Sequence, residues 1–284
     1  PIAHTDRYGG VWLPLTHEMV HEIAYDTDHF SSEGPVVGQL KPSEVPDRIG
    51  APIGPVPPIS SDPPFHAEAR RLLLPAFSPK KIDPWREEVI EICNKLIDDM
   101  GDADHIDAAL QYSQHIPVMV IARMLGLPVE DGDRFRGWVN LVLSGIGEER
   151  TEERMAKFEE FNQYLAYHVN DHMENPREDL ISFLLNAEIM GQKLSLEHTV
   201  GTVILLLIAG IDTTWSGIGS SLWHLASNSV DRRRLVENPD MIPAAIEEFL
   251  RAYAPVTMAR VVKEDMEFHG VQMKQEDWVL LPFP

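Results

Sequence analysis

Gly201-Thr-Val-Ile-Leu-Leu-Leu-Ile-Ala-Gly-Ile-Asp-Thr-Thr-Trp-Ser216 is an apolar run that also carries a carboxylate at Asp212 and hydroxyls at Thr213 and Thr214. Its apolar part, residues 203–211, is much shorter than the ~20 residues that cross a bilayer, so we expect the central helix of a water-soluble core. An unpaired buried carboxylate is costly. Two interpretations are open: a kink in which Thr213 bonds to a carbonyl one turn earlier, or a proton-handling pair that faces a cavity.

Helical spacing extends outward from this run. Ser195 is a suitable N-cap, and Glu197 suits the positive first turn, so we expect a helix over about Ser195–Ser227, on the order of 50 Å long. Further helices are expected at residues 17–25, 83–100, 116–125, 151–174 and 180–189, and strands at 257–262, 266–268 and 278–281. Residues 31–64 carry nine prolines and predict a long loop. The pattern predicts a mainly α fold with small β-sheets, and residues 1–284 are treated as one domain.

The composition narrows the function classes. The chain has 24 basic and 45 acidic side chains, a formal net charge of −21, and no concentrated basic stripe, which argues against nucleic acid as a partner. Cys93 is the one cysteine, so no intrachain disulfide can form and a cytoplasmic setting is expected. No apolar segment is long enough to predict a membrane anchor.

Three small clusters could carry chemistry. Glu248 and Arg251 lie three apart on one helix face among apolar residues, which favours a partly buried structural brace over a surface pair. His66 and Arg70 lie four apart, so one helix face would present an imidazole and a guanidinium to a carboxylate or phosphate; a solvated face explains them about as well. Arg260 lies in a strand-like segment whose alternation could turn it inward or toward water.

The run His17-Glu-Met-Val-His21 matches the H-E-x-x-H pattern of zinc proteases, but no obvious third ligand follows. We favour a solvated helix face, and the same holds for His168 and His172. Cys93 lies on an apolar helical stripe, which favours a packed thiol over a ligand or nucleophile. The sequence therefore predicts no metal site within these residues.

Together the motifs resemble one family. Ala209-Gly-Ile-Asp-Thr-Thr214 resembles the oxygen-activating helix of the cytochrome P-450 haem-thiolate monooxygenases, and Glu248-x-x-Arg251 is similar to that family's helix brace. Asp62-Pro-Pro-x-His66-x-x-x-Arg70 is similar to its haem-propionate helix. Pro176-Arg-Glu-Asp-Leu-Ile181 and His29-Phe-Ser-Ser32 are similar to bacterial members. Order and spacing agree over nearly all of the chain, and the missing anchor points to the soluble bacterial type.

The resemblance implies a partial cytochrome P-450 fold and a haem b cofactor. His66, Arg70 and Arg260 would bind the haem propionates, and Asp212 and Thr213 would deliver protons during dioxygen activation. A local distortion of the helix is expected at Ala209 and Gly210, because small residues let dioxygen and porphyrin approach the backbone. The family's axial ligand is a cysteine thiolate in a loop some tens of residues after the brace. We therefore expect it beyond Pro284, and both termini of the sequence to be cuts.

The implied reaction inserts one oxygen atom from dioxygen into a small, mostly apolar organic substrate. Leu205 and Ile208 precede Asp212 on the same side of the helix and, with Val256, would line the substrate pocket. Electrons would come from a ferredoxin and its NAD(P)H-dependent reductase, or from a fused reductase. The basic residues Arg71, Lys80, Lys81 and Arg86 are either the ferredoxin docking site or an ordinary solvated patch.

Two alternatives to the monooxygenase are kept. The first is a peroxide-driven peroxygenase of the same family, although relatives of that kind usually lose the acid and threonine pair. The second is a haem-free helical ligand-binding protein, which the missing cysteine loop would allow. The sequence identifies neither the substrate, the redox partner nor the oligomeric state.

Overall fold

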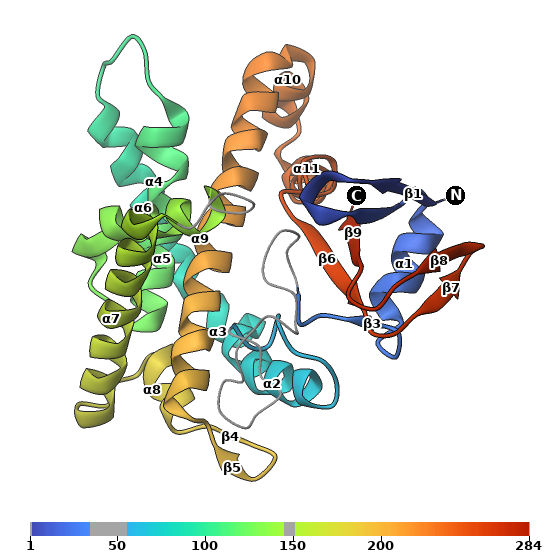
Figure 1. The fold of residues 1–284 in the computed structure, drawn as a ribbon. Helices are drawn as coiled ribbons and strands as arrows, with labels where there is room; N and C mark the ends of the chain where they lie inside the picture. Colours follow the sequence, from blue (N-terminus) through green and yellow to red (C-terminus); the bar gives the residue numbers. More distant parts are fainter. Residues whose placement is uncertain (1, 35–55, 145–150, 284) are drawn as a thin grey trace. The chain divides into compact units, whose positions relative to one another are not determined.

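The structure is a computed structural model that describes residues 2–34, 56–144 and 151–283 (Figure 1). Its helices are α1 His17–Tyr25, α2 Phe65–Leu73, α3 Pro79–Ile82, α4 Trp85–Met100, α5 His115–Leu125, α6 Gly132–Ser144, α7 Glu152–Glu174, α8 Leu180–Leu185, α9 Leu196–Ser227, α10 Ser229–Glu237 and α11 Ile242–Ala252. Its strands are β1 Ile2–Thr5, β2 Val11–Pro14, β3 Phe30–Ser31, β4 Glu188–Ile189, β5 Gln192–Lys193, β6 Thr257–Val262, β7 Met266–Phe268, β8 Val271–Met273 and β9 Trp278–Pro282. The mainly α fold with small sheets is confirmed, whereas most of the predicted loop at 31–64 lies outside the described residues.

Local sequence signals explain where the elements begin. The Thr16 side chain accepts a hydrogen bond from the backbone N–H of Met19 and caps α1, as predicted. The Ser195 hydroxyl accepts from the backbone N–H of His198 and caps α9, which spans the predicted central helix to within one residue. Gly126 adopts the left-handed conformation, φ 77°, that ends α5.

The chain divides into two compact units. The first comprises residues 1–75, 140–205 and 257–283, and the second residues 76–139 and 206–256. Each unit is built from distant parts of the sequence, and α9 contributes its first ten residues to one and the remainder to the other. The treatment of residues 1–284 as a single domain stays a prediction.

The first unit contains a five-stranded sheet with the order β1-β2-β9-β6-β3. β6 runs antiparallel to β9, and Arg260 pairs with Val279. Figure 1 shows α1 and the β7–β8 hairpin beside this sheet. Alternation along β6 places Val262 in a core with Ile23 of α1, whereas Ala259 and Val261 pack with Trp278 in a second core. Arg260 therefore shares the face of β6 that carries Val262.

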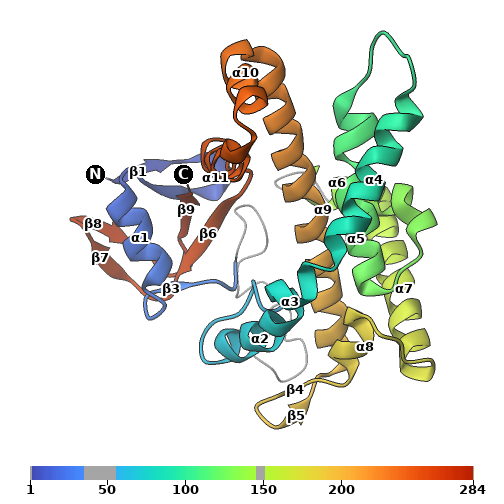
Figure 2. The same ribbon diagram turned by 180° about the vertical axis from the view of Figure 1, so that it is seen from behind.

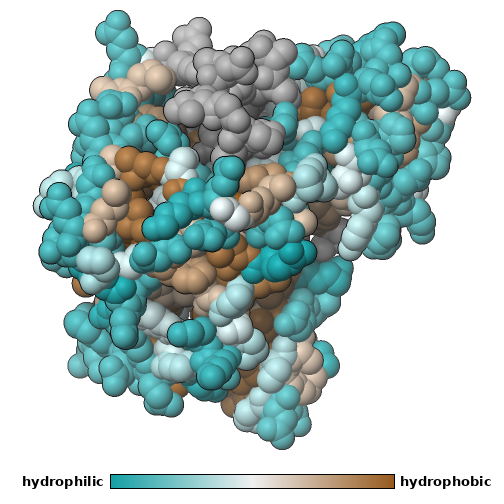
Figure 3. All heavy atoms as spheres, turned by 90° about the horizontal axis from the view of Figure 1, so that it is seen from below, coloured by the Kyte–Doolittle hydropathy of each residue, from teal (hydrophilic) through white to brown (hydrophobic). Residues whose placement is uncertain are grey.

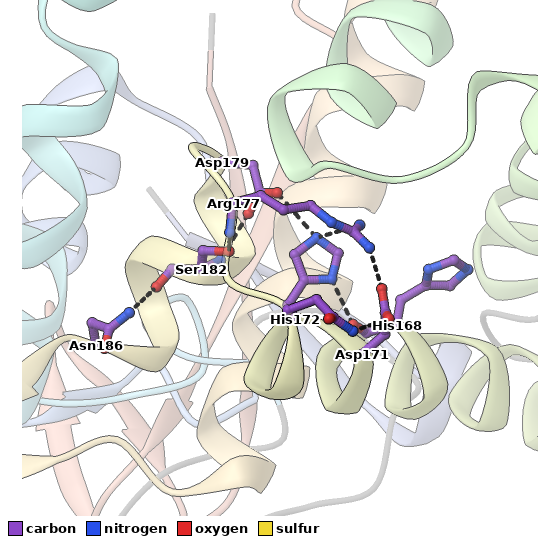
Figure 4. A network of polar contacts seen from close by, with 8 residues as sticks. His168, Asp171, His172, Arg177, Asp179, Ser182 and Asn186 are labelled. Carbon is purple, nitrogen blue, oxygen red and sulfur yellow. Dashed lines mark hydrogen bonds and ion pairs between the residues drawn. The ribbon is translucent and has the colours of Figure 1, made fainter.

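A network of polar contacts joins α7 to α8 in the same unit (Figure 4). The His172 imidazole, whose side chain is fully buried, has Nδ1 2.6 Å from the carbonyl oxygen of His168 and Nε2 3.0 Å from Asp179 Oδ2. Asp179 also caps α8 by accepting from the backbone N–H of Ser182, and Arg177 bonds to Asp171. The Pro176–Ile181 motif is thus the joint that sets where α8 begins after α7.

The second unit is helical. α4, α5 and the second half of α9 lie side by side in both ribbon views (Figures 1 and 2). Ile121 and Leu125 of α5 and Leu207 and Ile211 of α9 are buried in it. Gly210 permits the close approach of α9 to α5, because a Cβ on it would lie 3.0 Å from Ile121 Cγ1.

Two local predictions were wrong. The helix expected over residues 180–189 ends at Leu185, because the Asn186 side chain donates to the carbonyl oxygen of Ser182 and the chain then forms the β4–β5 hairpin. Met190 and Gly191 make its two-residue turn with φ of 54° and 77°. The strand β8 was not predicted. It returns antiparallel to β7 after the turn at His269 and Gly270.

The face of the molecule seen in Figure 3 is mostly hydrophilic, with smaller hydrophobic patches among the polar side chains. That surface agrees with the acidic composition, which favours solubility. By length and apolar composition alone, α9 could cross a membrane. One such helix is weak evidence, because the core helix of a soluble protein passes the same test.

Candidate functional site

The first unit brings one imidazole and two guanidinium groups into one cluster. His66 and Arg70 lie one turn apart on α2, and Arg260 comes from β6. Burial lowers the pKa of His66, and the charges of Arg70 and then Arg260 lower it further. Such Coulombic effects act over short distances, so Arg70 and Arg260 both lie near His66. The spacing predicted the α2 pair, whereas Arg260 was placed with it only by the family resemblance.

Arg260 is the informative member of this cluster. Its side chain is half-buried, and burial lowers its pKa while the charge of Asp62 partly offsets that effect. Its Nη1 donates to the carbonyl oxygen of Ala259 at 2.9 Å, which is its one hydrogen bond within the described residues. A guanidinium has five N–H donors, so this one keeps donors for an anion. The cluster therefore fits the carboxylates of a haem, and it would fit another carboxylate or phosphate by the same chemistry.

Asp212 and Thr213 lie in the second unit, in the middle of α9. The Thr213 hydroxyl donates to the carbonyl oxygen of Ala209 at 2.8 Å. Burial raises the pKa of Asp212, and a hydrogen bond with Trp215 partly opposes the increase. The carboxyl group therefore holds its proton to a higher pH than an exposed aspartate, which suits a group that relays protons.

The distortion expected at Ala209 and Gly210 is not observed, because α9 is one continuous α-helix from Leu196 to Ser227. The hydroxyl bond to Ala209 forms within regular helical geometry, as Thr side chains commonly do. Gly210 has a packing role instead, since Ile121 of α5 occupies the space that a Cβ would need. The part of the kink interpretation that concerns the hydroxyl bond is confirmed, and the kink itself is not.

A cavity of about 860 Å³ lies in the second unit beside Thr213 and Thr214. Its other lining residues are mostly apolar and come mainly from α9, α10 and α11; they include Ile218, Leu222, Leu235, Ile246, Phe249 and Leu250. Tyr112 also lines it, and burial together with a contact to Cys93 raises the pKa of that phenol to about 12. The Tyr112 phenol therefore stays protonated, and its hydrogen bond goes to Cys93. No spacing signal in the sequence had identified this residue.

Leu205, Ile208 and Val256 were predicted to line a substrate pocket. All three side chains are partly exposed, and none of them is among the residues that line the 860 Å³ cavity. Leu205 belongs to the first unit, and Ile208 and Val256 belong to the second. Their contact with substrate stays a prediction.

Glu248 and Arg251 form the predicted ion pair. Arg251 Nε and Nη2 donate to the two oxygens of Glu248 at 2.8 and 2.7 Å, a bidentate geometry. The expected partial burial was wrong, because both side chains are 61% exposed. α11 has no buried residue: its apolar side chains Ile246 and Leu250 line the 860 Å³ cavity and are about half exposed, so no described residue encloses the pair. Its role as a brace stays a prediction.

Two groups of residues near these sites were missed. His224 of α9 has Nδ1 2.7 Å from the Tyr253 hydroxyl and Nε2 3.1 Å from Asp231 Oδ2, so one imidazole connects α9, α10 and the end of α11. His198 is buried in the first half of α9, and its ring centroid lies 5.4 Å from that of Phe65 on α2. Both histidines lie on α9, and no spacing in the sequence pairs either of them with its partner, so only the tertiary structure identifies their contacts.

The other candidate ligands behave as solvated or packed groups. His17 and His21 are exposed, with ring centroids 6.3 Å apart, and His21 stacks on Tyr25. Among the residues that the structure describes, no group of three or more His, Cys, Asp or Glu side chains could hold a metal ion. Cys93 is partly buried against Tyr112. These findings agree with the solvated face expected for His17 and His21 and with the packed thiol. The same expectation was wrong for His172, which is buried between α7 and α8 with contacts to His168 and Asp179.

Comparisons with known proteins identify the family. A family model described as cytochrome P-450 matches residues 107–283. Cytochrome P-450(MEG) of Priestia megaterium is 31% identical over 281 residues, which cover 95% of this chain and 67% of that protein. Mycinamicin IV hydroxylase/epoxidase of Micromonospora griseorubida is 29% identical over 95% of this chain and 67% of its own length. The solved structure of CYP109E1 from Bacillus megaterium in complex with testosterone matches with a TM-score of 0.83 and 31% identity, over 99% of this chain and 71% of that one.

The fold and these matches define a class of enzyme, the haem-dependent oxidoreductases that act as monooxygenases. The chain belongs to the cytochrome P-450 family. Its relatives named above are bacterial, as the resemblance implied. The chain spans 67% of the length of cytochrome P-450(MEG) and 71% of the CYP109E1 structure. It spans 55% of a further relative, the polyketide biosynthesis cytochrome P-450 PksS of Bacillus subtilis.

Proposed function

We propose that this protein binds haem b and inserts one oxygen atom from dioxygen into a small, mostly apolar organic substrate. The observation that carries the proposal is the half-buried Arg260 guanidinium, which lies near His66 and Arg70 and makes a single hydrogen bond among the described residues. Such a cluster binds carboxylates strongly, because charge-assisted hydrogen bonds form away from bulk water. When bound, the haem iron would supply the activation of dioxygen, and the protein supplies binding, orientation and protons.

The proposed catalytic residues are Asp212 and Thr213. The Asp212 carboxyl group, whose pKa is raised by burial, would take a proton from solvent and pass it onward. The Thr213 Oγ1 donates to the carbonyl oxygen of Ala209 in this structure, so its oxygen is oriented and can accept that proton. Retention of both residues favours the monooxygenase over the peroxide-driven alternative, in which no such proton delivery is required.

The proposed substrate is mostly apolar. Leu205, Ile208 and Val256 would supply aliphatic contacts, and a site of this kind holds its ligand largely by shape. Solved relatives were obtained with testosterone and with myristic acid, both of which are largely hydrocarbon. We extend that chemical class, but no particular substrate, to this protein.

The proposed electron donor is a ferredoxin with its NAD(P)H-dependent reductase, or a fused reductase, in the cytoplasm. A ferredoxin-type partner would need a basic surface on this acidic protein. Lys80, Lys81 and Arg86 lie close together in sequence at α3 and the start of α4, and all three are exposed. Arg71 of the first unit is exposed and paired with Glu68 at 2.6 Å, so it contributes less free charge.

The proposal is tested by the carbon monoxide difference spectrum of the reduced full-length protein. A band at the position of a thiolate-bound haem, lost in Arg260→Leu preparations that still fold, is the expected result. Absence of bound haem in the wild-type protein would support the haem-free ligand-binding alternative. Turnover with hydrogen peroxide at the rate obtained with NAD(P)H and dioxygen would support the peroxygenase.

A further inference from the structure

Asp62 lies where three segments of the first unit meet. Its Oδ1 accepts a 2.7 Å hydrogen bond from the backbone N–H of Ser32, just after β3. Its Oδ2 lies 3.0 Å from Nζ of Lys263, the residue that follows β6. Its carbonyl oxygen accepts from the backbone N–H of His66 in the first turn of α2. One aspartate therefore connects the ends of β3 and β6 to the start of α2.

These segments carry the cationic cluster. His66 lies on α2, and Arg260 lies three residues before Lys263, far away in the sequence. The charge of Asp62 acts on both residues, since it offsets part of the pKa decrease that burial causes in each. The Asp62 side chain is only 15% exposed, so its ion pair with Lys263 is less screened by water than a surface pair.

The Asp62 carboxylate lies beside a cluster that would bind an anion, and its negative charge is unfavourable there. Like charges repel, so Asp62 by itself opposes the binding of a carboxylate ligand. We propose that Asp62 is a positioning residue of the cluster, which holds Arg260 and His66 in register for a carboxylate-bearing ligand at the expense of some repulsion. It acts through β6 and α2 and does not touch the ligand. This inference rests on the proposed haem-binding function.

Glu33 provides a matched comparison in the same unit. Burial raises its pKa, and the negative charge of Asp62 raises it further, so Glu33 is a second acid beside Asp62 and Lys263. Its carboxylate makes no hydrogen bond within the part of the chain that the structure describes, whereas Asp62 makes two side-chain contacts to other segments. Removal of either acid takes a carboxyl group from these surroundings, but only removal of the Asp62 carboxylate breaks the contacts to Ser32 after β3 and to Lys263 after β6.

The test is the rate at which haem leaves the full-length protein, measured by transfer to an excess of haem-free globin. Asp62→Ala is expected to speed haem loss about tenfold, the size of effect seen when a residue that orients a ligand is removed. Glu33→Ala is expected to leave the rate unchanged or to slow it. Asp62→Asn keeps an acceptor for Ser32 and should restore part of the retention. If charge alone matters, both alanine variants will slow haem loss, and the inference is wrong.

Two further measurements separate positioning from general destabilisation. The resonance Raman bending band of the haem propionates, which reports their hydrogen bonds, should shift in Asp62→Ala and in Lys263→Met and stay in place in Glu33→Ala. Should Asp62→Ala fail to fold, Lys263→Met and Asp62→Asn give the same comparison, and an unshifted band with wild-type haem loss in both overturns the inference. If the wild-type protein binds no haem at all, the proposed function is what fails.

Discussion

The hydroxyl of Thr213 donates a 2.8 Å hydrogen bond to the carbonyl oxygen of Ala209, one turn earlier in α9. The helix is continuous at this point, so the hydroxyl does not substitute for a missing backbone hydrogen bond. It fixes the direction of the Thr213 Oγ1 beside the 860 Å³ cavity that this residue lines. A hydroxyl that is oriented and borders a cavity can exchange a proton with whatever the cavity holds, because rotation about one bond redirects its hydrogen.

Replacement of this hydroxyl is expected to separate electron use from product formation. In Thr213→Ala the proton donor is lost, while the cavity gains only the volume of a few atoms. Product formed per NAD(P)H consumed should fall on the order of 10²-fold, within the range for loss of a proton-transfer group, and hydrogen peroxide should accumulate. Thr213→Ser keeps the hydroxyl and serves as the control. Equal coupling in the alanine variant and the wild-type protein would remove Thr213 from the proton pathway.

Asp212 is expected to make stability depend on pH in a direction opposite to that of most aspartates. Burial raises its pKa in the folded state, so the unfolded state releases this proton first as the pH rises. Its stabilising contribution is therefore complete below the unfolded pKa and is lost as the pH rises through the folded value. Asp212→Asn should be more stable than the wild-type protein at pH 7 and should approach it near pH 4. Urea unfolding at both pH values is the measurement, and a less stable asparagine variant at pH 7 would contradict the burial argument.

His198 is expected to give the opposite dependence of stability on pH. Burial lowers its pKa to about 4, so the folded protein keeps the ring neutral while the unfolded chain protonates it below pH ~6.5. Stability should be lost as the pH falls from about 6.5 to 4, by up to about 3 kcal/mol from this residue. His198→Leu should lack that part of the acid sensitivity. Parallel stability curves of the two proteins over this interval would show that the ring is not buried as described.

Much of the fold could be predicted from periodicity. α9 is found within one residue of its predicted start, because its apolar run is long and a serine caps it. The end of α8 could not be predicted, since the Asn186 side chain ends the helix through a contact to Ser182 that helical spacing does not encode. β8 is three residues long and carries no alternation of its own, so its pairing with β7 is what defines it.

Site residues that share one element were easier to predict than those that do not. The spacing of His66 and Arg70 places both on one face of α2, and the spacing of Glu248 and Arg251 gives their bidentate pair. Arg260 lies near His66 although the two are far apart in sequence and on different elements, so no local pattern contains their approach. The exposure of Glu248 and Arg251 could not be predicted from local sequence either, because it depends on which residues cover α11.

The lysines of α3 provide a test of the proposed electron donor. Lys80→Glu with Lys81→Glu should slow reduction by a ferredoxin roughly tenfold at low salt, because electrostatic steering raises association rates by factors of this size and larger. The dependence of the rate on salt should also become flatter. Lys157→Glu on α7, an exposed lysine already paired with Glu153, is the matched control and should have little effect. An unchanged rate in the double variant at low salt would support the solvated-patch interpretation.

Two glycines of α9 give opposite expectations for the same substitution. Gly210→Ala places a Cβ 3.0 Å from Cγ1 and 3.2 Å from Cδ1 of Ile121, and overpacking of this kind costs about 1–3 kcal/mol, which exceeds or cancels the ~1 kcal/mol that alanine adds to helix stability. Gly217→Ala meets only Leu250 Cδ2 at 3.7 Å, an ordinary contact, so it should raise the free energy of unfolding by up to ~1 kcal/mol. Thermal or urea unfolding of both variants measures the difference. Ile121→Val should recover part of the loss in Gly210→Ala, because it removes the Cδ1 atom from the crowded space. If instead both alanines stabilise the protein equally, Gly210 is not the point of close packing between α9 and α5, and room for a bound ligand becomes the better explanation of a small residue there.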